Sequence, residues 1–176
     1  SWLGDLGETP DLEAGSALVA RLYVGRFGPV TAADLQWWTG WTMGHTRATL
    51  TALADAGETA PVRVAEGEAV VLADDVAPVS PPPPWVALLP ALDPSTMGWK
   101  HRDFYLGPHR PHLFDRNGNA GPTVWVDGRA VGGWAIRDDG SVGLDLLEDV
   151  DGGAAVALDG HVRELEAFLD GAVVKA

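Results

Sequence analysis

The feature that most constrains this sequence is a pair of short helices joined by a tight turn, expected over residues 30–56. Thr31 stands where a helix N-cap belongs and Asp34 follows three residues later, which is a capping signature. Gly40 can end the first helix and Thr42 can cap the second. One buried face of the second helix is predicted by residues at spacings of three and four, namely Met43, Thr46, Leu50 and Leu53. The stretch is a helix-turn-helix candidate.

A helix is expected before this stretch and a β-hairpin after it. The first helix reaches about Phe27, with an apolar face predicted from Leu18, Val19, Leu22 and Tyr23. Two β-prone runs, 62–65 and 69–72, flank Glu66-Gly67-Glu68. Three helices followed by a hairpin are the order of a winged helix. The two glutamates make the tip of this wing a poor contact for phosphate.

A proline-rich segment divides the sequence. Pro78 and the run 81–84 predict a stiff linker over 76–85, between a winged-helix domain at 12–75 and a second domain at 86–171. In the second domain strands are expected at 85–89, 123–126, 129–136 and 142–147, with a loop at 107–122 and a tight turn at Asp127-Gly128. A final helix carries Leu158, Val162, Leu165 and Leu169 on one face. The predicted fold class is α+β: a winged helix followed by a small antiparallel β-barrel or sheet with a C-terminal helix.

Composition narrows the functional classes. The 176 residues carry a net charge of −13, which argues against broad affinity for nucleic acid because phosphate contacts rest on Lys and Arg. There are no cysteines, so disulfides and cysteine-based metal sites are excluded. No apolar run is long enough to span a bilayer, and no leader of the secretory type opens the sequence. We expect cytoplasmic residence and no membrane partner.

The middle of the chain differs from the rest in charge. Residues 81–116 hold Lys100, Arg102, Arg110 and Arg116 against three aspartates, and they add three histidines. An anion, if one is bound, is expected there. His109, His112 and Asp115 have metal-ligand types at spacings of three, but Pro108 and Pro111 favour a loop with surface histidines. We therefore predict no metal site. The Gly-x-Ser-x-Gly motif, the Walker phosphate loop and the dinucleotide-binding glycine motif are all absent, so we also predict no cofactor and no catalytic residue.

The second helix of the opening pair has little base-reading chemistry. Its predicted outward residues are Gly44, His45, Ala48, Thr49 and Ala52, with Arg47 at the border. Base edges are read mostly by Arg, Lys, Asn and Gln, so only His45 and Arg47 are candidates.

Several motifs nevertheless occur together in a distinctive order. They are FGPVTAADLQWWTG at 27–40, LLPALD at 88–93, GWKHR at 98–102, FDRNGN at 114–119, PTVWVDGR at 122–129 and VGGW at 131–134. Over residues 15–171 this order resembles the bacterial winged-helix family that includes the AlkZ-type DNA glycosylases. The resemblance implies tandem winged helices closed by a small β-barrel, and removal of alkylated or crosslinked bases from double-stranded DNA.

The resemblance also implies where catalysis and DNA contact lie. The family's catalytic element is a Gln-x-Gln or Gln-x-Asp motif in an N-terminal half, whereas Gln36 is the only glutamine here and lies in a different motif. By position, the DNA-contacting candidates of the second domain are Arg116, Asn117, Asn119, Arg129 and Arg137. With the basic segment and the helix candidates, the full predicted set is Lys100, His101, Arg102, Arg116, Asn117, Asn119, Arg129, Arg137, His45 and Arg47.

Three functional hypotheses remain. The first is the DNA-binding C-terminal portion of a glycosylase-like protein, non-catalytic by itself, with the missing N-terminal half as a partner. The alternative is a winged-helix interaction or scaffolding module that does not read DNA. An independent enzyme is the least favoured.

Overall fold

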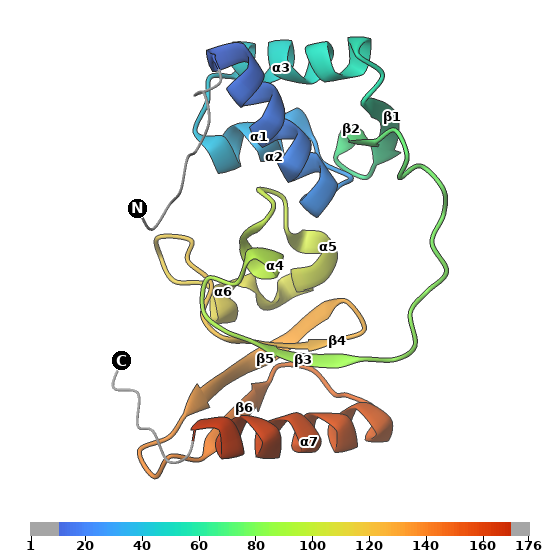
Figure 1. Cartoon of the computed structure of the whole chain (residues 1–176). Helices are drawn as coiled ribbons and strands as arrows, with labels where there is room; N and C mark the ends of the chain where they lie inside the picture. The colour runs from blue at the N-terminus through green and yellow to red at the C-terminus, as the bar shows by residue number, and fades with distance from the viewer. Residues whose placement is uncertain (1–10, 170–176) are drawn as a thin grey trace, which may run out of the picture. The chain divides into compact units, whose positions relative to one another are not determined.

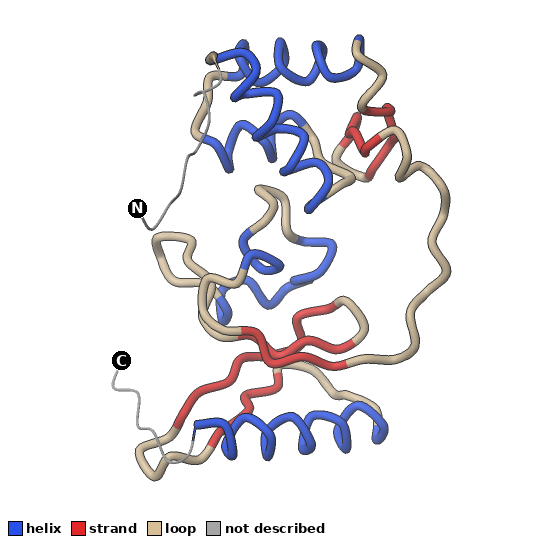
Figure 2. The backbone as a smooth tube through the Cα atoms, viewed as in Figure 1, coloured by secondary structure: helices blue, strands red, loops and turns tan. Residues whose placement is uncertain are grey.

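The computed structural model describes residues 11–169, whose elements form two compact units. The first unit runs to Val79 and includes Gly98–Lys100; the second holds Ser80–Met97 and the chain from His101 onward. Helices and a hairpin build the first unit, and a sheet with its helices builds the second (Figures 1 and 2). The predicted domain boundaries at 12–75, 76–85 and 86–171 stay a prediction, and residue 171 lies outside the described residues.

The first unit has the element order expected from the sequence. Helices α1 (Leu12–Phe27), α2 (Ala32–Thr39) and α3 (Met43–Asp55) precede a two-stranded antiparallel sheet of β1 (Thr59–Val64) and β2 (Gly67–Leu72). The capping prediction for α2 is confirmed. The Thr31 hydroxyl accepts from the Asp34 backbone N–H, and the Asp34 carboxylate accepts from the Thr31 backbone N–H at 2.9 Å. Gly40 ends α2 with φ of 72°, in the left-handed region.

The apolar face predicted for α1 is wrong. Leu18 and Leu22 are 51% and 60% exposed and Val19 is 38% exposed, and only Tyr23 of the predicted face is buried. The buried face instead carries Ala20, Tyr23, Val24 and Phe27. Because two aromatic rings at spacing four bury more area than the leucines do, they decide which side of α1 packs on α2 and α3.

A short segment from later in the chain completes this core. The Trp99 ring lies edge-on to Phe27, with centroids 5.3 Å apart, and its Nε1 donates to the Phe27 carbonyl at 2.9 Å. The Tyr23 hydroxyl donates to the Gly98 carbonyl at 2.6 Å. The backbone N–H of Lys100 donates to Asp34 Oδ1 at 2.9 Å. The buried Asp34 thus caps α2 and also holds Gly98–Lys100 in the first unit.

The second unit contains an open four-stranded sheet. Strands β3 (Val86–Leu89), β4 (Thr123–Val126), β5 (Arg129–Ile136) and β6 (Val142–Leu146) are antiparallel neighbours in chain order. The barrel expected as one alternative is wrong, since β6 and β3 form no ladder in the described chain, and the sheet alternative is confirmed. Helix α7 (Gly152–Leu169) covers one face, where Leu158 packs with Val124 and Val131. Because α7 covers the apolar face of the sheet, the sheet does not have to close into a barrel to shield that face from water.

The tight turn between β4 and β5 matches its prediction. Asp127 and Gly128 have φ of 47° and 83°, the left-handed pair that a two-residue hairpin turn requires. The loop expected at 107–122 is wrong in its first half. After α4 (Pro94–Met97) and α5 (Asp103–Leu106) come a 3₁₀ turn, η1 (Gly107–His109), and α6 (Arg110–Leu113). Pro108 and Pro111 occupy first-turn positions, where a helix does not use the missing N–H.

Candidate nucleic-acid interface

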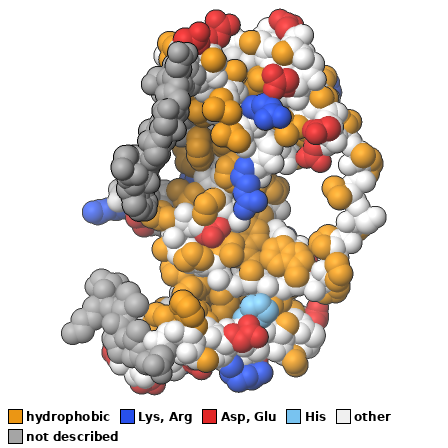
Figure 3. All heavy atoms as spheres, in the orientation of Figure 1, with side chains coloured by type: hydrophobic (Ala, Val, Ile, Leu, Met, Phe, Trp, Pro, Cys, Tyr) orange, Lys and Arg blue, Asp and Glu red, His pale blue; other side chains and the backbone are white. Residues whose placement is uncertain are grey.

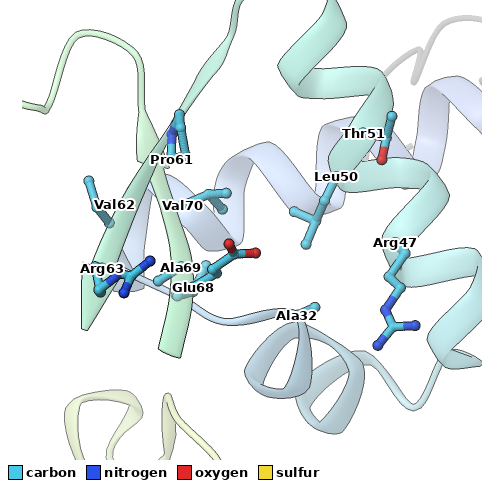
Figure 4. Close-up of a pocket in the computed structure, with 11 residues that line it drawn as sticks. Ala32, Arg47, Leu50, Thr51, Pro61, Val62, Arg63, Glu68, Ala69 and Val70 are labelled. Carbon is cyan, nitrogen blue, oxygen red and sulfur yellow. The ribbon is translucent and has the colours of Figure 1, made fainter. Parts of the chain in front are cut away.

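A hollow of the first unit lies between α3 and the β1–β2 hairpin (Figure 4). Its volume is about 770 Å³, and its floor is apolar, with Val30, Leu50 and Val70 among the lining residues. Arg47 rises on the α3 side and Arg63 on the hairpin side (Figure 4). Neither guanidinium group forms an ion pair with another described residue. The hollow therefore presents two exposed cations, opposed by one carboxylate, Glu68.

Arg63 was not among the residues predicted from the sequence. The prediction for the hairpin rested on its acidic tip, whereas Arg63 lies within strand β1, paired in register with Glu68. The alternation along Val62-Arg63-Val64 could have identified it, because successive side chains of a strand point to opposite faces. Arg63 and Arg47 belong to different elements, so only the fold brings them to one hollow.

The remaining predicted residues of the first unit differ in accessibility. His45 is half-buried: its Nε2 lies 3.0 Å from the Ser16 hydroxyl and its ring packs edge-on against Trp41. Thr49 was expected to face outward, but it is buried, with 7% of its surface exposed. Its hydroxyl donates a hydrogen bond to the His45 carbonyl at 3.0 Å. Lys100 has an exposed side chain on a backbone fixed by Asp34. Lys100 and Arg47 are thus the accessible predicted cations of this unit.

In the second unit, cations gather around Phe114. Arg102 is 3% exposed, with its guanidinium carbon 4.8 Å from the centre of the Phe114 ring, and the exposed Arg110 lies 6.0 Å from it. Beside them, burial raises the pKa of Tyr105, whose hydroxyl donates to the Thr96 carbonyl at 2.6 Å. His101 is exposed next to Arg102. Arg102 therefore supports the local fold, while Arg110 and His101 are open to solvent.

The loop after Phe114 presents Arg116 and Asn117. Asp115 Oδ1 accepts from the backbone N–H groups of Asn117 and Asn119, both at 2.8 Å, and Oδ2 accepts from the Asn119 amide at 3.0 Å. Hydrogen bonds from Asn119, with those from Asn117 and Gly118, lower the pKa of Asp115. Asn119 is thus occupied in holding the loop. Arg116 and Asn117 are exposed, and their side chains bond to no other described residue.

Arg129 is engaged in a local ion-pair network. Its Nη2 donates to Glu148 Oε2 at 2.9 Å, and His109 Nε2 lies 2.9 Å from the same oxygen. The hydrogen bond from Arg129, followed by that from His109, lowers the pKa of Glu148. His109 is 8% exposed, whereas the Arg129 side chain is 50% exposed. The network ties η1 to the start of β5 and to the segment after β6.

Arg137 lies across strand β6. Its guanidinium approaches Gly143 so closely that a Cβ there would lie 2.7 Å away, and its backbone N–H donates to the Ser141 carbonyl at 2.8 Å. No group of three or more potential metal ligands is found in residues 11–169. Within residues 11–169, none of the helices combines the length and the hydrophobicity that a transmembrane span requires. Of the predicted residues, Arg47 lies at the α3–hairpin hollow, whereas Arg102 contacts Phe114 and Arg116 and Asn117 follow Phe114 in the loop.

These observations define an α+β protein with two compact units and exposed cations on an otherwise acidic chain. The family model described as DNA glycosylase AlkZ-like matches residues 1–168, and the chain therefore belongs to the AlkZ-like DNA glycosylase family. The resemblance found in the motifs is confirmed. No curated protein sequence matches the chain significantly.

A solved structure similar to this chain is that of the Streptomyces sahachiroi DNA glycosylase AlkZ. The TM-score is 0.76 and the sequence identity 25%, over 93% of this chain and 46% of AlkZ. This chain thus spans about half the length of the AlkZ structure.

Proposed function

We propose that the chain is the DNA-binding C-terminal portion of a DNA glycosylase-like protein that repairs alkylated or crosslinked bases. The observation that carries this proposal is the family match over residues 1–168. In this proposal residues 12–75 are a winged-helix domain, 76–85 a linker and 86–171 the second domain. Double-stranded DNA is the partner, and no cofactor is required.

The portion is proposed to be non-catalytic by itself. A Gln-x-Gln or Gln-x-Asp motif is absent from this sequence, because Gln36 is the only glutamine and Trp38 stands two residues after it. Gln36 also has a structural role, since its side-chain amide donates to the Trp41 carbonyl at 3.2 Å, across the turn between α2 and α3. An amide that holds this turn is not available to position a water at a sugar.

The predicted DNA-binding residues then divide by role. Lys100, Arg116 and Asn117 are exposed and reach phosphate, and Arg47 does so with Arg63 at the α3–hairpin hollow. Arg102, Asn119 and Arg129 instead hold the surface in shape through Phe114, Asp115 and Glu148. His45 supports α3 through Ser16. His101 and Arg137 are secondary contacts, exposed on the second unit.

Fluorescence anisotropy with duplex DNA at low and moderate salt tests the proposal. The net charge of −13 keeps affinity modest, and binding should weaken as salt rises because contacts to phosphate release counterions. Replacing Lys100 and Arg116 together by Ala should lower affinity about tenfold for all DNA sequences alike, because contacts to phosphate do not depend on the bases. The salt slope should also fall by about one for each phosphate contact that is lost. Arg163→Ala, which removes one cation from α7, is the control and should have little effect. Absence of binding at low salt contradicts the proposal.

A second candidate is an interaction module that packs on another part of a glycosylase-like protein without contacting DNA. The exposed leucines of α1 favour it. A salt-independent association with a protein partner, without DNA binding, would select this candidate over the first.

A further inference from the structure

The second unit has a hollow of its own on the face of the sheet that α7 does not cover, beside α6 (Figure 1). Its volume is about 400 Å³. A Cβ on Gly133 would lie 3.3 Å from the Pro122 carbonyl oxygen and 3.7 Å from the Leu113 side chain, so Gly133 faces α6 and the segment before β4. The charged and titratable side chains that line the hollow are His112, Arg137 and Asp145.

Arg137 lies flat on the floor of this hollow. A Cβ on Gly143 would be 2.7 Å from each of its Cζ, Nε and Nη2 atoms. A point at this one distance from three atoms of a planar group lies above the face of the group and not beyond its edge. The guanidinium is therefore stacked face-on over Gly143, where only a glycine leaves room for it. Its other face is open, because Arg137 is exposed and forms no ion pair with another described residue.

The open face of a guanidinium is a platform for a planar ring. In the same hollow, His112 and Asp145 can donate to and accept from the edge of such a ring. Small-ligand pockets begin at about 300 Å³, so this hollow is large enough for one heterocyclic base. Trp134 is not the platform, because its Nε1 donates to the Leu89 carbonyl at 2.8 Å and its ring packs against the cluster beneath α7.

A phosphate suits this hollow less well than a base does. Asp138 and Asp139 follow Arg137 directly, and Asp145 is part of the lining, so three carboxylates oppose an anion near one guanidinium. On the face that Figure 3 shows, Lys and Arg side chains lie apart from one another and do not form one basic patch. A nucleobase is uncharged, and the aspartates do not repel it.

We propose that this hollow binds one unpaired nucleobase of a DNA strand, which stacks on Arg137 and is held at its edge by His112 and Asp145. The base must be unpaired, because a base inside a duplex has its faces covered by neighbours and its edge by its partner. The inference rests on the proposed function, in which the chain binds DNA. It adds that the chain distinguishes DNA with an unpaired base from fully paired DNA, and it gives Arg137 a stacking role in place of a contact to phosphate.

The test compares two duplexes of one sequence, one fully paired and one with a single extra, unpaired adenine, by fluorescence anisotropy. The native chain should bind the bulged duplex about tenfold more tightly, as expected when one base stacks on a protein side chain. Arg137→Lys keeps the charge but not the plane, so it should abolish this preference and change affinity for the paired duplex less than about twofold. A contact to phosphate alone would survive the change to lysine.

Gly143→Ala tests the geometry without removing Arg137. The added Cβ displaces the guanidinium from the floor, so the preference for the bulged duplex should again be lost. Gly160→Ala, on α7, is the matched control, because its Cβ would meet no neighbouring atom, and it should leave the preference unchanged. Circular dichroism checks folding. If Gly143→Ala is unfolded, His112→Ala at an exposed position replaces it and should reduce the preference about threefold.

Free deoxyadenosine separates the base from the strand that carries it. Competition that displaces the bulged duplex and spares the paired one supports the inference. Deoxyadenosine binding by a chain that does not prefer the bulged duplex would overturn it, because the hollow would then serve a free nucleoside.

The outcomes also separate this inference from the proposed function. Equal affinity for the two duplexes, or a preference that persists in both Arg137→Lys and Gly143→Ala, overturns the unpaired-base site and leaves DNA binding supported. Absence of binding to either duplex at low salt contradicts the proposed function and the inference together.

Discussion

Two arginines of the second unit were predicted from the sequence to contact DNA, and the structure gives them opposite surroundings. Arg129 lies at the start of β5 and donates two hydrogen bonds through Nη2 to Glu148, which also contacts His109. Arg116 lies in the loop that Asp115 organises, and its guanidinium forms no hydrogen bond or ion pair with another described residue. The two residues have the same chemistry and similar positions beside tight turns.

The role of each cation depends on whether a carboxylate oxygen within hydrogen-bond distance is available to it. Glu148 is 19 residues from Arg129 in sequence, but the sheet brings them to 2.9 Å. Asp115 is adjacent to Arg116, but its oxygens are occupied by backbone N–H groups and the Asn119 amide. Arg129 thus stabilises the fold through Glu148, whereas Arg116 remains available to contact phosphate.

Glu148→Gln should change the stability of the chain more than any other substitution considered for these two arginines. A neutral amide keeps the shape but weakens the hydrogen bonds from Arg129, and it leaves the 8% exposed His109 without a carboxylate. We expect the free energy of unfolding to fall by about 1–2 kcal/mol, the usual cost of disturbing a partly buried hydrogen-bonded group. Urea denaturation measures it. The released Arg129 should also raise affinity for DNA, and unchanged stability would contradict the structural role assigned to Glu148.

Arg116→Ala and Arg129→Ala should separate the two roles. Arg116→Ala is expected to reduce DNA affinity about three- to tenfold, with stability unchanged within about 0.5 kcal/mol, as for most exposed positions. Arg129→Ala should instead lower the unfolding free energy and change DNA affinity less. Anisotropy and urea denaturation on the same preparations measure both. Equal loss of DNA affinity in the two variants would show that the ion pair does not withdraw Arg129.

The elements that could be predicted from the sequence are those specified by local signals. The Thr31–Asp34 capping box and the Asp127-Gly128 turn need only neighbouring residues, and both are confirmed. Helix α7 was predicted from the spacing of its leucines, because one side of it has a single apolar stripe. Family membership followed from motifs spread in order along the chain.

What failed depends on contacts between distant residues. Helix α1 has apolar residues on two sides, and Trp99 from far along the chain helps to select the aromatic side. Barrel closure depends on whether the first and last strands meet, which no local pattern reports. Arg63 and the Glu148 network could not be recognised for the same reason, since their partners come from other elements.

Acid should selectively weaken the Arg129 network. The folded-state pKa of Glu148 is lowered from its ordinary value of 4.5, first by the hydrogen bond from Arg129. A lowered pKa means that its contribution to stability is fully present above the unfolded-state pKa and is lost as pH falls through the folded-state pKa. The stability difference between the native chain and Glu148→Gln should therefore be constant near neutral pH and shrink below about pH 4.5. Urea denaturation from pH 7 to pH 3 measures it, and a constant difference would contradict the pairing.

A small effect on DNA affinity is expected from a substitution in the loop that carries Arg116. Gly118 has φ of 86° in the loop that Asp115 holds, and its backbone N–H donates to the Asp115 carbonyl at 3.0 Å. A side chain at this φ costs about 1 kcal/mol, although a Cβ there would meet no neighbouring atom. Gly118→Ala should loosen the loop and reduce DNA affinity about twofold, because Arg116 is then less well placed for phosphate. Gly57→Ala, at φ of 72° just after α3, carries a similar backbone strain, its Cβ would also meet no neighbouring atom, and it should leave DNA affinity unchanged. Equal effects of the two substitutions would mean that loop order at Arg116 does not contribute to binding.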